Sequence, residues 1–101
     1  MGSRDDLQDV LVELLGSENV YYDPPPSLNM KYPAIRYSKS DIQTTYADNK
    51  TYSSMKRYEI IVIDKKADNP VIEKLLQLPY CSFDRHYKSD NLNHDVLILY
   101  Y

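Results

Sequence analysis

Residues 38–56 constrain the fold of this chain more than any other segment. They are largely polar, yet their composition favours β-structure. The apolar or aromatic members of this segment are Ile42, Tyr46, Ala47, Tyr52 and Met55. Threonine and tyrosine on both sides of its centre favour strands. Asp48, Asn49 and Lys50 favour a turn, because Asp and Asn tolerate left-handed backbone. We therefore expect residues 38–56 to form a long β-hairpin arm that projects past the domain body. An isolated two-stranded hairpin is marginal in water, so a neighbour would have to order it.

The length and charge of the chain narrow the possible classes of protein. Its 101 residues suit a single domain with one core, and we treat residues 1–101 as that domain. Residues 1–3 (Met-Gly-Ser) are consistent with a remnant of an expression tag. Twelve basic and fifteen acidic residues give a net charge of −3, which argues against specific nucleic-acid binding. No stretch approaches the roughly 20 apolar residues of a transmembrane helix.

Tyrosine is over-represented, with eleven tyrosines against one phenylalanine and no tryptophan. The tyrosine ring is apolar and its hydroxyl needs a polar partner, so the residue is common at protein interfaces. Tyrosine is equally at home in ordinary β-strands. Composition alone leaves both interpretations open.

Two segments show the pattern of amphipathic helices. The first runs from Ser3 to Leu15, with a capping serine at its start and Gly16 placed to end it in the left-handed conformation. Its apolar stripe consists of Leu7, Val10, Leu11 and Leu14. The second begins at Asn69-Pro70, a capping residue followed by proline, and stops before Pro79. Its inner face consists of Val71, Ile72, Leu75 and Leu76.

Four segments have the composition of strands: 32–37, 57–64, 80–87 and 94–101. From Ile60 onward the second of them is apolar on both faces, so we expect it to be central and covered on both sides. Val20–Tyr22 is a shorter strand-like piece, and the prolines that follow it favour an extended connector. The expected order is α-β-β-α-β-β. It predicts an α+β two-layer sandwich, with an antiparallel sheet, two helices on one face and the projecting hairpin arm.

The last two predicted strands and the turn between them contain both histidines of the chain and three aspartates close to them in sequence. The residues concerned are Asp84, His86, Asp90, His94 and Asp95. If these strands pair, a metal site of two histidines and one carboxylate is conceivable. The spacing matches no compact zinc pattern, and a histidine near an aspartate on an exposed strand is common. We therefore predict no metal site.

Cys81 is the single cysteine, which excludes an internal disulfide and agrees with a reducing compartment. A catalytic thiol needs an activating base and a stabilised oxyanion. Neither of the chain's two glycines, Gly2 and Gly16, lies near it in sequence, and its strand context favours a buried apolar role. Lys65-Lys66 is interpreted as solvated charge in a turn. No glycine-rich phosphate loop is present. We predict no enzymatic activity and no cofactor.

Several runs resemble small proteins from the head–tail module of long-tailed phages. They are KLLQLPYCSFDRHY at 74–87, DNLNHDV at 90–96, MKYPAI at 30–35 and YADNK at 46–50, and the resemblance covers most of the chain after residue 28. Such proteins are tail terminators or head–tail joining (tail completion) proteins. The resemblance implies helices packed on a β-sheet, a ring of usually six subunits at the end of the tail tube, and no catalytic residues.

We therefore expect a non-enzymatic virion protein that forms a ring at the head–tail junction after assembly in the host cytoplasm. Its expected partners are copies of itself, the tail-tube protein and the head connector or stopper proteins, with DNA only in transit past an acidic lumen. The expected contact residues lie in the arm: Ile42, Tyr46, Asp48, Asn49, Lys50 and Tyr52. The alternative is a small monomeric protein-binding or regulatory module that uses a Tyr-rich face.

Overall fold

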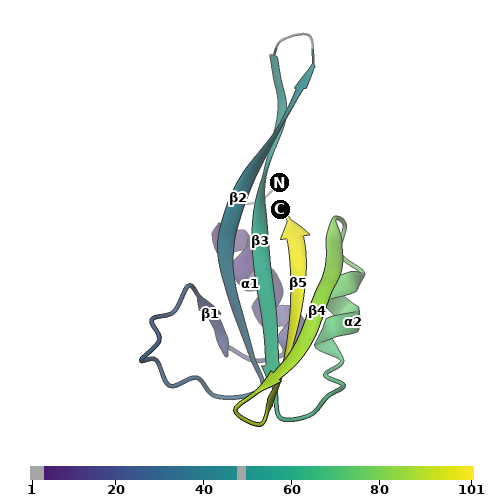
Figure 1. The fold of residues 1–101 in the computed structure, drawn as a ribbon. Coiled ribbons are helices and arrows are strands. Elements are labelled where there is room, and N and C mark those ends of the chain that lie inside the picture. The colour runs from purple at the N-terminus through teal and green to yellow at the C-terminus, as the bar shows by residue number, and fades with distance from the viewer. Residues whose placement is uncertain (1–3, 48–49) are drawn as a thin grey trace.

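The computed structural model describes residues 4–47 and 50–101, without the side chains of residues 41–55. In chain order the elements are α1 (Arg4–Leu15), β1 (Val20–Tyr22), β2 (Ala34–Ala47), β3 (Lys50–Asp64), α2 (Val71–Leu76), β4 (Cys81–Ser89) and β5 (Leu92–Tyr100) (Figure 1). Over the described residues they form a small compact α+β domain with a five-stranded mixed sheet and two helices.

The strands lie in the order β1-β2-β3-β5-β4. β2 with β3, β3 with β5 and β5 with β4 pair antiparallel, whereas β1 pairs parallel with β2 in the register Val20↔Ile35. The expectation of a purely antiparallel sheet with four strands is therefore wrong. The physical reason lies in residues 23–33, which carry the chain from the end of β1 back to the start of β2. Parallel pairing requires such a crossover.

One apolar core lies between the sheet and the two helices. Leu7 and Leu11 of α1 and Val71 and Leu75 of α2 are fully or almost fully buried. The sheet contributes Val20, Ile35, Tyr37, Tyr58, Ile60, Val62, Leu97 and Leu99. These positions alternate along their strands and so face the same side. Each fully buried aliphatic side chain contributes about 1.5–3 kcal/mol by leaving water.

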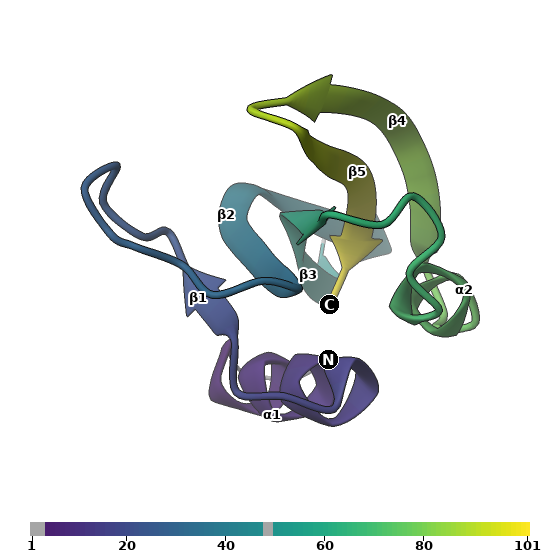
Figure 2. The ribbon, with the colours of Figure 1, turned by 90° about the horizontal axis from the view of Figure 1, so that it is seen from below.

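The opposite face of the sheet also buries apolar side chains. Ala34, Ile63, Val96 and Ile98 point away from the core cluster by alternation, and all are at most 8% exposed. In Figure 2 the β4–β5 hairpin curves over the side of the sheet that lies away from α1. The expectation that the strand from Ile60 onward is covered on both sides agrees with the burial of Val62 and Ile63.

Local signals in the sequence explain where the helices begin and end. The Gly16 backbone has φ +76° and its N–H donates to the Val12 carbonyl at 2.9 Å, so the glycine ends α1 as predicted. The Asn69 side chain accepts a hydrogen bond from the Val71 N–H at 2.9 Å, which confirms its place at the start of α2. Ser3, the predicted cap of α1, lies outside the described residues.

The β4–β5 turn is tighter than the sequence indicated. Asp90 and Asn91 have φ +54° and +63°, and Ser89 pairs with Leu92. Two central residues with positive φ are the signature of a type I′ turn, whose twist matches that of the flanking strands. Both strands therefore extend further toward the turn than the predicted ranges 80–87 and 94–101.

Tyr37 and Tyr58 are buried in the core, and the partly buried Tyr22 packs against them, so these tyrosines are packing residues of the domain. The ring centroids of Tyr22 and Tyr37 lie 5.1 Å apart, and those of Tyr37 and Tyr58 lie 6.1 Å apart. The Tyr37 hydroxyl donates to Gln8 Oε1 at 2.5 Å, and Gln8 Nε2 donates to the Val20 carbonyl at 3.1 Å. Tyr37 and Tyr58 are therefore core residues, and α1 provides the polar partner that the Tyr37 hydroxyl needs.

Alkaline titration tests this arrangement. Burial raises the pKa of Tyr37 from 10.0 to about 12, and the charge of Arg4 opposes the shift. The resulting stability is complete below the unfolded-state pKa and is lost as pH rises through the folded-state pKa. Between pH 10 and pH 12 we expect the wild type to lose about 2 kcal/mol more unfolding free energy than Tyr37→Phe, measured by urea unfolding. Tyr80→Phe, at an exposed position, should follow the wild type. Identical pH profiles for wild type and Tyr37→Phe would contradict the burial argument.

Candidate interaction surface

β4 forms one edge of the sheet, because β5 is its only strand partner among the described residues. Apart from Cys81, every residue of this nine-residue strand is exposed. An edge strand presents N–H and C=O groups that no neighbouring strand satisfies, which makes it a template for pairing with another chain. The outer edge of β4 is therefore the first candidate for an interaction surface.

Large apolar side chains accompany this edge. Tyr80, immediately before β4, is 69% exposed and has φ +62°, while Phe83 and Tyr87 within the strand are 46% and 38% exposed. α2 packs beside β4, and Leu76 in its last turn is 41% exposed. Exposed aromatic residues next to unpaired backbone are more typical of a contact surface than of a solvated strand.

A β-bulge divides β4. The register shifts between Phe83 and Arg85, which leaves Asp84 as the additional residue. Arg85 Nη1 donates to Asp84 Oδ2 at 2.5 Å, and the Arg85 guanidinium lies 5.9 Å from the centroid of the Tyr87 ring. The bulge and these charges disfavour unspecific pairing along the strand.

The two histidines lie on opposite faces of the β4–β5 hairpin. His86 is paired with Asp95, and its Nδ1 is 2.7 Å from Asp95 Oδ1 on the helix side. His94 pairs with Tyr87, and their rings stack with centroids 4.7 Å apart. Neighbouring positions along a strand point to opposite sides, so the two imidazoles do not converge on one ion. Within the described residues no group of three potential ligands is placed to hold a metal.

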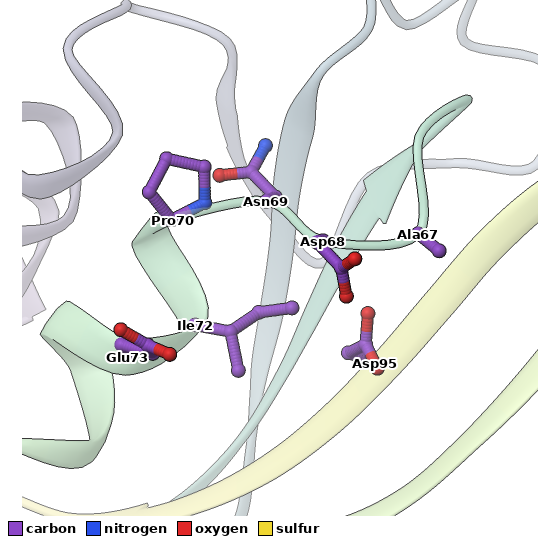
Figure 3. Close-up of a pocket in the computed structure, with 7 residues that line it drawn as sticks. All are labelled: Ala67, Asp68, Asn69, Pro70, Ile72, Glu73 and Asp95. Carbon is purple, nitrogen blue, oxygen red and sulfur yellow. The ribbon is translucent and has the colours of Figure 1, made fainter.

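A shallow pocket lies between the β3–α2 connection, α2 and β5 (Figure 3). Its volume is about 430 Å³, and it is lined by Ala67, Asp68, Asn69, Pro70, Ile72, Glu73 and Asp95. All three charged lining residues are acidic, and Asp95 already bonds to His86. The pocket therefore disfavours anionic ligands.

The structure places Cys81 partly buried against the core cluster. Burial raises the pKa of its thiol, which favours the protonated and less nucleophilic form. This agrees with the interpretation of Cys81 as a small apolar side chain.

None of the six contact residues predicted from the sequence has a described side chain. Asp48 and Asn49 lie outside the described residues, and the side chains of Ile42, Tyr46, Lys50 and Tyr52 are not described either. The backbone is described at the last four of these positions. Ile42 pairs with Lys56, and Tyr46 pairs with Thr51.

The sequence reasoning missed the edge formed by β4, although a signal for it was present. β5 contains four consecutive apolar residues, Val96 to Leu99, all buried, as befits an interior strand. β4 mixes aromatic residues with Asp84, Arg85 and Lys88, which is typical of an edge. The difference in composition between the two strands therefore indicates that β5 is interior and β4 is at the edge of the sheet.

In comparisons with known proteins, no family model matches the chain, and the search of curated proteins gives no match. Neither α1 nor α2, the helices of the described part, has the length and apolar character needed to cross a membrane.

Amide hydrogen exchange tests whether the β4 edge is open. The Tyr100 N–H donates to the Tyr80 carbonyl, so by alternation the N–H groups of Cys81 and Phe83 point outward. After the bulge the outward groups are those of His86 and Lys88. In dilute solution we expect these amides to exchange at least about tenfold faster than those of Ser82 and Tyr87, by NMR. Uniform protection along β4 would show that the edge is covered.

Proposed function

We propose that the protein is a non-enzymatic phage virion protein that oligomerises into a ring at the head–tail junction, where it terminates the tail tube or joins tail to head. The observation that carries this proposal is a sheet with two unlike open edges. One is β4, and the other is the outer side of β2 beyond Tyr37, where pairing with β1 ends. Two different edges on one subunit suit a head-to-tail contact between copies.

The arm predicted at residues 38–56 belongs to this proposal. β2 and β3 remain paired from Asp41↔Arg57 to Ala47↔Lys50, whereas the β3–β5 pairing begins only at Arg57. In Figure 1 these ends of β2 and β3 extend beyond the other strands. A two-stranded ribbon outside the sheet gains little stability of its own, which favours support from a neighbour. We propose that the arm contacts that neighbour through the predicted residues Ile42, Tyr46, Asp48, Asn49, Lys50 and Tyr52.

The phage role rests on the resemblance in residues 30–35, 46–50, 74–87 and 90–96. On this resemblance the proposed ring has six copies and lies in the virion between the tail-tube protein and the head connector or stopper. DNA passes through it in transit. Head-to-tail contacts generate a closed ring when the rotation between neighbours closes. The net charge of −3 suits a conduit that does not retain DNA.

The alternative of a monomeric module with a Tyr-rich face has less support. Tyr37 and Tyr58 are buried and pack with the partly buried Tyr22. The exposed tyrosines are separated, with Tyr32 before β2 and Tyr80 and Tyr87 at β4. Among the residues with described side chains, tyrosines therefore do not gather into a single face.

Native mass spectrometry over a range of protein concentrations tests the ring. We expect the monomer to give way to one closed species of fixed subunit number, with no ladder of larger assemblies, because a closed ring leaves no free edge. A monomer at every concentration would contradict the proposal and favour the binding module. A continuous ladder would indicate an open filament.

A further inference from the structure

We infer that β4 is the docking strand for the arm of a second copy of this chain, which adds the free edge of β2 to the sheet as a sixth strand. This inference rests on the ring proposed above and identifies the two surfaces that meet. The acceptor is β4 from Cys81 to Ser89 with its exposed aromatic residues. The donor is β2 from Ser38 to Ala47, where no strand other than β3 pairs with it among the described residues.

The pairing has to be between copies. Within one subunit β3 and β5 lie between β2 and β4, so the free edges of these two strands face opposite margins of the sheet. The two free edges also match in length, since the acceptor has nine residues and the donor runs from 38 to 47. The unpaired backbone N–H and C=O groups of one edge can form hydrogen bonds with those of the other.

The backbone directions fit such an addition. The Ile35 N–H donates to the Asn19 carbonyl of the segment leading into β1, so odd-numbered residues at the start of β2 turn their N–H outward. The register shift between Lys39 and Asp41 moves this role to even-numbered residues, including Ile42 and Thr44. Proline at position 44 would therefore block the donor edge and leave the β2–β3 pairing intact.

The side chains around β4 explain why a partner strand would bind here. Phe83 is nearly half-exposed, Tyr80 is more exposed still, and Leu76 on α2 is exposed beside the strand. A strand laid along β4 would cover this apolar surface while it satisfies the backbone. In strand addition, main-chain hydrogen bonds provide affinity and contacts of side chains provide specificity. The exposed side chains beside β4 can supply the second of these.

The contact is heterologous, which makes a sharp complementation experiment possible. Phe83→Lys places a charge on the acceptor edge but leaves the arm intact. Thr44→Pro blocks the donor edge but leaves β4 intact. We expect each variant alone to associate at least about tenfold more weakly than the wild type. An equimolar mixture should form a one-to-one dimer through the single contact that remains, and no ring. Tyr32→Lys, which alters an exposed aromatic residue away from both edges, is the matched control and should assemble like the wild type.

Native mass spectrometry of the single variants and the mixture gives the outcomes, and isotope labelling of one variant identifies mixed species. A mixed dimer, with both variants monomeric alone, supports the inference and shows that both variants are folded. If the wild type forms a ring but Phe83→Lys assembles equally well, the ring stands and β4 is not its docking strand. If the wild type does not assemble at all, the ring and the inference both fail.

Discussion

Four consecutive side chains of β5, Val96 to Leu99, are buried because the strand lies between β3 and β4 and is covered on both faces. The antiparallel pairing of β5 with β3 joins the β4–β5 hairpin to the rest of the sheet, because β4 pairs with no other described strand. On one face Leu97 and Leu99 belong to the same core cluster as buried residues of both helices, and Val96 and Ile98 are buried on the other face. β5 therefore contributes buried apolar side chains to both faces of the sheet.

Much of this architecture is visible in the sequence, for reasons that particular residues make clear. Gly16 and Asn69 act over one helical turn, so their roles can be predicted locally. The residues of β1 have strand character, but its parallel pairing with β2 cannot be predicted in this way. Val20–Tyr22 is only three residues long, and its pairing with β2 depends on the path of the chain through residues 23–33. Long-range pairing of a short strand carries little local signal.

The same distinction applies to the interaction surface. A polar, strand-forming stretch at 38–56 predicts a hairpin, but not which surface it meets. The mixed polar and aromatic composition of β4 is typical of an edge strand, and the strand order shows which edge it forms, because it leaves β4 without an outer partner among the described strands. The histidines show the converse. His86 and His94 are close in sequence to several carboxylates, yet strand alternation sends them to opposite faces.

The proposed ring would follow from backbone groups that one sheet leaves unpaired. β2 and β4 both carry backbone groups that the described strands leave unpaired, at opposite margins of the molecule, and a neighbouring copy can pair them. Electron cryomicroscopy of the assembled protein tests this account most directly. We expect a closed ring in which the sheet continues from β4 of one subunit into β2 of the next. A ring whose subunits touch only through α1 and α2, with both strand edges facing solvent, would contradict it.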